Sequence, residues 1–172
     1  NYILRKSVNL SKQTHILAAN IDILFLVITL NNPVTTTNFI DRFLISSNAY
    51  SIDTILLFNK IDSYNKNQIL EIEKLINIYT KIGYKCIKIS ATENLNINKI
   101  IPLIKNKTIM FGGHSGTGKT SIINCIEPKL DLKTANIIIG YKKNISNEAT
   151  KTSATVPAVY LTKPVLMISL SR

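Results

Sequence analysis

The chain has 172 residues, of which 45% are hydrophobic, and this length and composition favour one globular domain and exclude a largely disordered chain. Its longest apolar run, residues 23–30, is far shorter than the ~18 residues that a membrane-spanning helix needs. We therefore expect a cytoplasmic protein with no signal peptide and no membrane partner. The net charge of +11 favours a polyanionic partner such as RNA, although a compositional drift towards Asn, Ile and Lys is an alternative explanation.

The two cysteines, Cys86 and Cys125, are far apart in the sequence and form no C-x-x-C pair, so we expect two buried, reduced thiols. Because the chain has no Cys/His cluster, the sequence predicts no zinc. The first residue is Asn1 rather than Met, within a polar basic segment, as expected of a piece of a longer protein.

The first part of the chain, residues 1–19, shows no clear hydrophobic period and carries several basic side chains, so we interpret it as a basic linker or arm. The folded domain is then expected over residues 20–172. Within it, the continuous apolar run at residues 23–28 predicts a strand covered on both faces. Residues 35–50 predict a helix that begins after threonine caps, and residues 54–58 predict a second strand.

An amphipathic helix is predicted over residues 68–81, where apolar side chains recur at positions i, i+3 and i+7. Gly83 is its expected C-terminal cap. Residues 84–89 and 108–111 predict two further strands, and the short helix predicted between them, at residues 97–104, is weakened by a proline.

The helix after the fourth strand is predicted from near Lys119 to about Glu127, where a proline ends it. Residues 129–151 are polar and poorly patterned, which indicates a long loop. Residues 158–161 and 165–169 predict the last two strands. Strands that alternate with helices in this way predict an α/β fold around a mostly parallel sheet.

The most informative stretch is residues 108–124, where an apolar strand leads into glycines and then into a helix. Gly113, Gly118, Lys119 and Thr120 match the phosphate-loop pattern G-x-x-x-x-G-K-[ST] without a mismatch. Glycines let successive N–H groups curl around a phosphate, while the lysine would reach the β- and γ-phosphate oxygens and the Thr120 hydroxyl would coordinate Mg²⁺. The alternative is a glycine-rich turn that matches by chance. The predicted phosphate-binding residues are Gly113, His114, Ser115, Gly116, Thr117, Gly118, Lys119, Thr120 and Ser121.

A guanine-recognition motif, Asn59-Lys60-Ile-Asp62, directly follows the second strand. The Asp62 carboxylate can accept hydrogen bonds from guanine N1–H and the 2-amino group, a pair of donors that adenine lacks, so a buried Asp62 argues against a P-loop ATPase or kinase. The Lys60 stem can lie along the base, and Asn59 can tie this loop to the phosphate loop. Ser90 and Ala91, after the third strand, can offer backbone N–H groups to guanine O6. The alternative is a polar turn that caps the next helix.

The order of these motifs is the reverse of that in ordinary small GTPases, since the guanine motif precedes the phosphate loop; this order is typical of circularly permuted GTPases. Together with Arg5-Lys-Ser, the segment at residues 15–22, Asn32-Pro-Val and Phe39-Ile-Asp-Arg-Phe, it resembles the RsgA (YjeQ) family of GTPases that depend on the small ribosomal subunit. The resemblance implies a three-layer P-loop NTPase fold, GTP/GDP and Mg²⁺ as ligands, and the small ribosomal subunit and its rRNA as partners. We expect a monomer.

The sequence also departs from the family's pattern. The OB-type and zinc-binding domains that flank the family's GTPase domain are not visible here. The family's switch segment resembles G-K-H-T-T-T, and the best match here places Thr152 at the His position, while Thr155, with Lys119, remains a catalytic candidate. The family's D-T-P-G has no counterpart after residues 165–168. Two hypotheses therefore stay open: a GTPase that hydrolyses GTP to GDP and phosphate during small-subunit maturation, and a hydrolytically impaired GTP/GDP-binding module of ribosome assembly.

Overall fold

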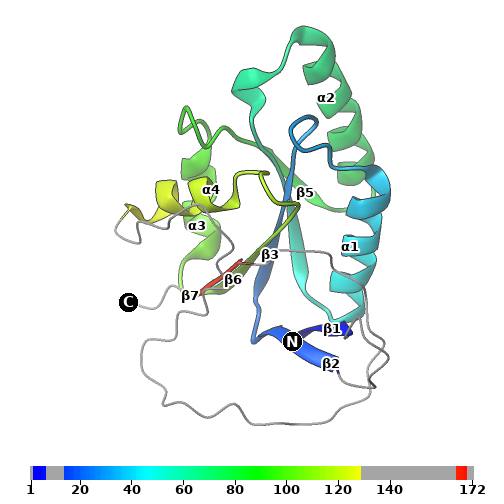
Figure 1. Cartoon of the computed structure of the whole chain (residues 1–172), viewed down its shortest axis with the longest axis vertical. Helices are drawn as coiled ribbons and strands as arrows, with labels where there is room; N and C mark the ends of the chain where they lie inside the picture. Colours follow the sequence, from blue (N-terminus) through cyan, green and yellow to red (C-terminus); the bar gives the residue numbers. More distant parts are fainter. Residues whose placement is uncertain (1, 7–13, 129–165, 170–172) are drawn as a thin grey trace.

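Two β-sheets occur in the part of the chain that the computed structural model describes, which is residues 2–6, 14–128 and 166–169 (Figure 1). The larger sheet has five strands in the order β5-β4-β3-β6-β7. Strands β3 to β6 are parallel, whereas β7 runs antiparallel to β6. This arrangement confirms the predicted α/β fold with a mostly parallel sheet. The strands are β3 (Ile23–Ile28), β4 (Asp53–Phe58), β5 (Lys85–Lys88), β6 (Thr108–Gly112) and β7 (Leu166–Ser169).

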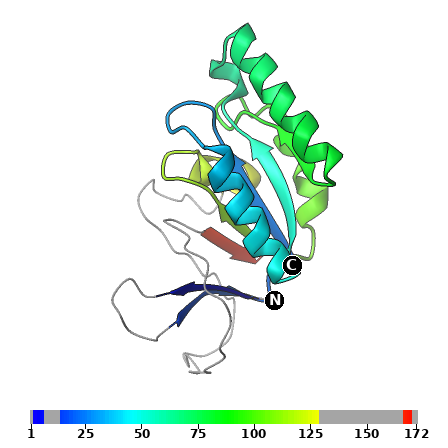
Figure 2. The same cartoon turned by 90° about the vertical axis from the view of Figure 1, so that its right-hand side faces the viewer.

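Helices cover both faces of this sheet, which makes three layers (Figures 1 and 2). Helices α1 and α2 pack on one face, and α3 and α4 pack on the other, together with the second of two short 3₁₀ turns. Each face has its own apolar core, with Leu24, Leu26 and Leu56 on the α1–α2 side and Phe25, Val27 and Leu57 on the other. The bounds are α1 (Thr37–Ala49), η1 (Ile61–Ser63), α2 (Lys66–Lys81), η2 (Ile97–Lys99), α3 (Ile101–Ile104) and α4 (Lys119–Ile126).

The strand at the centre of the molecule is β3, which lies between β4 and β6. All six of its side chains are buried, as expected for a parallel strand that has helices on both sides. Its continuous apolar run was therefore a reliable signal for a central strand.

Capping residues fix where the first two long helices begin. The Thr36 side chain accepts a hydrogen bond from Phe39 N at the start of α1. Asn65 and Gln68 form a reciprocal capping box, which starts α2 at Lys66, two residues before its predicted start. After α2 the chain passes through Gly83 at φ = +100°, the left-handed conformation expected of a glycine that follows a helix.

The smaller sheet lies in the segment that the sequence analysis interpreted as a linker or arm. Strand β1 (Tyr2–Lys6) pairs with the antiparallel strand β2 (Thr14–Ala19), and the register shifts between Ile3 and Leu4. Such a shift interrupts the two-residue alternation by which strands are recognised in sequence. This explains why no strand was predicted in this segment.

The last described strand, β7, confirms the strand predicted for residues 165–169. Its direction determines where the chain leaves the sheet. Because it runs antiparallel to β6, Ser169 pairs with Thr108 and Leu166 pairs with Phe111. The chain therefore leaves β7 at the end of the sheet where β6 begins, opposite to the loop that follows β6. The predicted loop at residues 129–151 and the predicted strand at 158–161 lie outside the described residues. No helix within the described ranges is long and apolar enough to cross a bilayer.

Candidate functional site

Loops from four adjacent parallel strands meet at one edge of the larger sheet. The carboxyl ends of parallel strands lie at the same edge, which is where open α/β sheets bind their ligands. Here the loops after β5, β4, β3 and β6 follow one another along that edge. They carry the predicted guanine motifs (after β4 and β5) and the predicted phosphate loop (after β6), so the three predicted motifs are neighbours in space.

The phosphate loop needs its glycines for two separate reasons. Gly113, Gly116 and Gly118 all have φ between +83° and +138°, where side chains other than glycine are strained. A Cβ atom at Gly113 would lie 2.5 Å from Val27 O, and one at Gly118 would lie 2.4 Å from Asn59 Nδ2. The loop is therefore packed directly against the ends of β3 and β4, and this packing holds the backbone in the curled form that a phosphate would contact.

Lys119, the first residue of α4, is buried inside this loop, with 7% of its surface exposed. Its Nζ atom donates hydrogen bonds to Gly113 O at 3.0 Å and to His114 O at 2.6 Å. Burial lowers the pKa of Lys119 to about 8. The loop thus holds a desolvated ammonium group that an approaching phosphate would stabilise.

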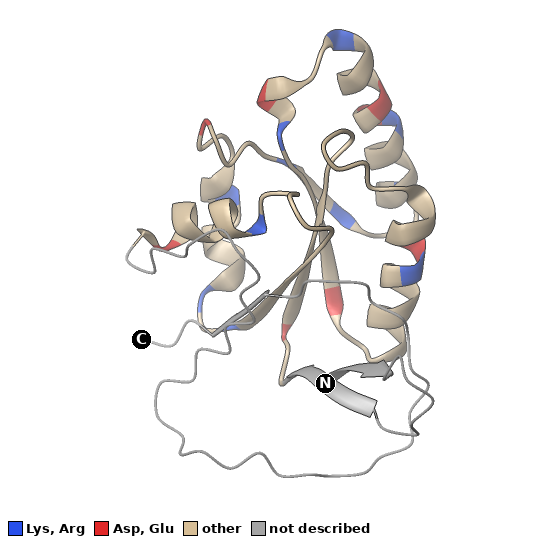
Figure 3. Ribbon diagram, viewed as in Figure 1, with Lys and Arg blue, Asp and Glu red and all other residues tan. Residues whose placement is uncertain are grey.

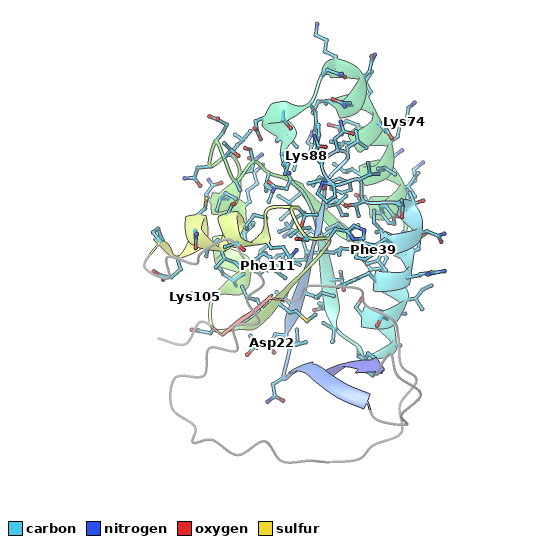
Figure 4. The ribbon with its side chains drawn as sticks, viewed as in Figure 1. Asp22, Phe39, Lys74, Lys88, Lys105 and Phe111 are labelled. Atoms are coloured by element: carbon cyan, nitrogen blue, oxygen red, sulfur yellow. The ribbon has the colours of Figure 1, made fainter. Side chains whose placement is uncertain are left out.

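The second residue of the loop, His114, packs on α1. Its ring lies 4.0 Å from the ring of Phe39, centroid to centroid, with an interplanar angle of 33°. Figure 4 labels Phe39 on α1. Burial, and then the charge of Lys119, lower the pKa of His114, which favours its neutral imidazole. From the sequence, Phe39 was noted only as the start of a family-like segment, and its support of the phosphate loop was missed.

Asn59 joins the guanine motif to the other two loops. Its side chain is 2% exposed, its Nδ2 atom donates to Thr117 O at 2.8 Å, and its Oδ1 atom accepts from Ala91 N at 3.1 Å. The tie between Asn59 and the phosphate loop is the contact that the sequence predicts. The second bond, to Ala91, extends the connection to the loop after β5.

The backbone N–H groups assigned to guanine O6 differ from the expectation. Ser90 N–H donates to Leu95 O at 3.1 Å, and Ala91 N–H donates to Asn59 Oδ1. Both donors therefore already have partners within the protein. For Ser90 the reason is its isolated bridge with Leu95, which the sequence pattern did not indicate, and for Ala91 it is the buried Asn59 side chain.

The other two residues of the N-K-x-D motif lie at the surface. Lys60 adopts a left-handed conformation with φ = +65°, and its Nζ atom donates to Asn32 O. Asp62, in the single turn of η1, is exposed, whereas the sequence analysis expected a buried carboxylate. An unpaired carboxylate is costly to bury, and exposure leaves the Asp62 carboxylate in contact with solvent.

The loop between β3 and α1 is a further part of the site, although the sequence indicated it only through Asn32-Pro-Val, one of the family-like segments. Its backbone is fixed by a hydrogen bond from Leu30 N to the Tyr64 hydroxyl at 2.9 Å and by one from Thr29 Oγ1 to Pro33 O at 2.6 Å. Pro33 also approaches the phosphate loop, since its Cδ atom lies 3.5 Å from the place of a Cβ at Gly116. Because β3 lies between β4 and β6, the loop that follows β3 lies between the two loops that carry the predicted motifs, and this position is the signal that could have identified the β3–α1 loop.

The remaining predicted residues are less constrained. Thr120 is half-buried in the first turn of α4, and Ser115 and Ser121 are exposed. Within the described residues, no group of three or more His, Cys, Asp or Glu side chains could hold a metal ion. Thr120 is the metal-binding candidate predicted from the sequence, and Thr155 lies outside the described residues.

Figure 3 shows that the charged residues of the described part do not separate by sign, because both basic and acidic positions occur on α1 and on α2. The net charge alone therefore does not locate an RNA-binding face.

Comparison with known proteins identifies relatives along most of the chain. The family model for the RsgA GTPase matches residues 1–159. Proteins named small ribosomal subunit biogenesis GTPase RsgA, from Flavobacterium psychrophilum and Christiangramia forsetii, are each 56% identical over 137 residues, which is 80% of this chain and 42% and 44% of theirs. The chain therefore spans less than half the length of these curated relatives.

Solved structures of the same kind resemble the fold. YjeQ from Thermotoga maritima superposes with a TM-score of 0.64 at 31% identity and covers 77% of this chain and 45% of its own. YloQ, described as a circularly permuted GTPase, has a TM-score of 0.56 at 32% identity and covers 64% of this chain and 39% of its own. These neighbours support the permuted topology, and the matches in sequence establish that the chain belongs to the RsgA GTPase family.

Proposed function

We propose that this chain binds GTP and GDP and, in its full protein context, hydrolyses GTP to GDP and phosphate during maturation of the small ribosomal subunit. The observation that carries this proposal is the position of Asn59, which hydrogen-bonds both the phosphate loop and the loop after β5. The buried Asn59 side chain thereby connects the predicted phosphate loop with the two predicted base-binding loops. The names of the relatives support the same activity.

The phosphate end would be bound by the loop after β6. Its residues fit a polyphosphate because the glycine backbone is already curled and the Lys119 ammonium group is buried at its centre. The Thr120 hydroxyl would hold Mg²⁺, which neutralises phosphate charge when it is bound. Ser115 and Ser121, both exposed, would contact the phosphates from the edge of the loop.

The base end would be bound by the loops after β4 and β5. Asp62 would accept from guanine N1–H and the 2-amino group, and its exposure leaves the carboxylate accessible to a ligand. The Lys60 stem would lie along the base, since its Nζ atom is held on Asn32 O across the site. Ser90 and Ala91 would shape the pocket at guanine O6.

The partners follow from the family rather than from a surface patch. We propose that the small ribosomal subunit and its rRNA are the partners, that the protein acts in the cytoplasm as a monomer, and that this chain holds no zinc. The relatives' names point to the small subunit. The net charge of +11 is consistent with contact to RNA.

Base specificity is tested by displacement of a fluorescent GDP analogue. We expect unlabelled GDP to displace it and ADP to fail at the same concentration, because adenine lacks the two donors that Asp62 would accept. Equal displacement by ADP would refute guanine specificity, and no binding of either nucleotide would refute the site.

Hydrolysis is tested by GTP turnover at fixed Mg²⁺ with and without purified small ribosomal subunits. We expect stimulation by the subunit, and large subunits are the matched control. The alternative is a nucleotide-binding module with impaired hydrolysis. It is based on Thr152 at the family's switch His position and on the unmatched D-T-P-G motif. GDP binding without turnover in either condition would favour that alternative.

A further inference from the structure

An open groove of about 540 Å³ lies along β5, the outer strand of the described five-stranded sheet (Figure 1). Ile76 of α2 lines one side of this groove, and Pro102 and Leu103 of α3 line the other. None of the residues assigned to the nucleotide site is among those that line it. We call this surface the β5 groove, and it is separate from the proposed nucleotide site.

The backbone at this edge offers more free donors than acceptors. Ile89 N–H donates to Phe58 O on β4 at 2.8 Å, so in the parallel pairing every second residue counted back from Ile89 directs its polar groups toward β4. The polar groups of Cys86 and Lys88 therefore point away from β4, into the groove. Lys88 O already accepts from Asn96 Nδ2 at 2.9 Å, whereas in the described part of the chain the two N–H groups have no partner. Two donors and one acceptor, Cys86 O, thus remain available.

The side chains of the β5 groove add positive charge to these donors. Three lysines line it, Lys85, Lys88 and Lys99, and no Asp or Glu is among the described residues that do so. Lys85 and Lys99 are exposed and have no ion-pair partner within the described ranges. Lys88 pairs with Glu73 of α2, at the rim of the groove. The groove is therefore basic, with a single carboxylate beside it.

Such a surface suits an oxyanion better than an added β-strand. A strand that pairs with an edge needs donors and acceptors in alternation, and Asn96 already occupies the outward carbonyl of Lys88. Each phosphate of a nucleic acid backbone carries a negative charge and acceptor oxygens, which ammonium groups and backbone N–H groups can both contact. The described lining contains no aromatic side chain on which bases could stack, so contact would be to the backbone and independent of base sequence.

We propose that the β5 groove binds the phosphate backbone of RNA through Lys85, Lys99 and the free N–H groups of Cys86 and Lys88. The inference rests on the RNA partner of the proposed function and deepens it, because it assigns the RNA a surface that the net charge alone does not locate. The competing explanation is that the lysines only discourage pairing of the β5 edge with another chain.

The first test removes the two unpaired charges from the 172-residue chain. Fluorescence anisotropy of labelled dodecauridylate measures RNA affinity, and titration with fluorescent GDP checks the nucleotide site of the same proteins. The double variant Lys85→Gln, Lys99→Gln should weaken RNA binding by about tenfold at ~0.1 M salt and leave GDP affinity unchanged. The slope of log affinity against log salt concentration should also become shallower by about 1.4, which is roughly 0.7 for each lost contact to a single strand.

The matched control is the double variant Arg42→Gln, Lys74→Gln, which makes the same change in net charge. Both positions are exposed, on α1 and α2, and neither lines the β5 groove. In the view of Figure 4, Lys74 and Lys88 lie on opposite sides of α2. The control should keep the affinity and the salt dependence of RNA binding close to those of the wild type.

The second test strengthens the groove. Glu73→Gln removes the carboxylate at the rim and releases Lys88, so RNA binding should tighten by about threefold. Glu71→Gln removes an exposed carboxylate from the same helix that does not line the groove, and it should have a smaller effect. A gain specific to Glu73→Gln cannot arise from net charge alone.

Three results would overturn the inference while leaving the nucleotide site intact. The first is equal loss of RNA affinity in the groove and control variants, which would assign the attraction to net charge. The second is unchanged RNA binding with self-association of the groove variant, which would assign Lys85 and Lys99 to protection of the sheet edge. The third is a labelled deca-glutamate peptide that binds more tightly than the RNA and loses affinity in the groove variant, since the occupant would then be an acidic protein segment.

Failure of the proposed function has a different signature. A wild-type chain that binds RNA but not GDP would refute the nucleotide site and leave the β5 groove standing. A wild-type chain that binds GDP but no RNA would overturn the inference together with the proposed RNA partner.

Discussion

The phosphate loop and the two base loops lie at the same edge of the sheet but are held in different ways. The phosphate loop is packed: Thr117 is fully buried, Lys119 is nearly so, and a Cβ at Gly113 would collide with Val27 O. The base loops are held by a few polar contacts, and Asp62, the residue expected to select guanine, is exposed.

Because of this difference, mutations at the two ends of the site should affect stability and ligand binding differently. In the packed end, a substitution changes stability and ligand binding together because the same atoms serve both. In the base end, a substitution can change ligand binding with little effect on stability. Asn59 stands between these cases, since it is buried yet belongs to the guanine motif.

The largest effect is expected at the centre of the packed end. Lys119→Ala removes the buried ammonium group and should weaken GDP binding by about 100-fold or more, the loss expected for charge-assisted contacts to phosphate, while the chain stays folded. Titration with fluorescent GDP measures the affinity, and circular dichroism checks the fold. Lys107→Ala is the control, because Lys107 is exposed just before β6 at the opposite end of the sheet. Retained binding would contradict the assignment of the phosphate loop.

The second prediction separates the two ends of the site. Asn59→Ala leaves Thr117 O and Ala91 N–H without their partner, so we expect about 1–3 kcal/mol lower stability and roughly 30-fold weaker GDP binding. Denaturant unfolding and GDP titration measure the two effects. Asn98→Ala, at an exposed position, should change neither. If Asn59→Ala destabilised the chain but bound GDP as tightly as the wild type, the three loops would not act as one site.

The strand and the helix of the packed end were predictable from the sequence because their signals are local. The glycines of the loop, Lys119 and Thr120 lie in one short stretch of sequence, so the pattern can be recognised without knowledge of the rest of the fold. The bond from Asn59 to Thr117 spans 58 positions, yet it was also predictable, since adjacent parallel strands bring their carboxyl-end loops together.

Other features depended on contacts that no local pattern encodes. The bulge between Ile3 and Leu4 hid the β1–β2 pairing, and the pairing of Ala91 with Cys125 joins side chain to backbone across 34 positions. The contact of His114 with Phe39 needs the relative placement of a loop and a helix, which follows only from the assembled sheet. The direction of β7 also depends on tertiary contacts, since it is set by the antiparallel pairing with β6.

The third prediction concerns the charge in the packed end. Burial lowers the pKa of Lys119 from 10.5 to about 8, so below pH 8 the folded chain bears the cost of a buried ammonium group. Between pH 8 and 10.5 the unfolded chain binds more protons at this residue than the folded chain, and stability at this group therefore rises with pH. Relative to Lys119→Met, the wild type should therefore gain on the order of 2 kcal/mol in free energy of unfolding between pH 8 and 10.5.

This difference is measured by denaturant unfolding of both proteins at pH 7 and pH 10, where the titration of all other groups cancels. A stability difference that does not change with pH would show that Lys119 is not desolvated in the folded chain.

The smallest effect on binding is expected at the exposed end. Asp62→Asn replaces an acceptor by an amide that can present only one oxygen to guanine, so GDP affinity should fall by about tenfold, while stability changes by less than ~0.5 kcal/mol because Asp62 is exposed. The same amide can donate to the 2-carbonyl of xanthine, so the variant should bind xanthosine diphosphate better than the wild type does. Glu93→Gln, which also neutralises an exposed carboxylate near the base loops, is the matched control. A variant that lost stability as well as affinity would show that Asp62 is part of the fold, and the contrast between the packed and exposed ends would then not hold.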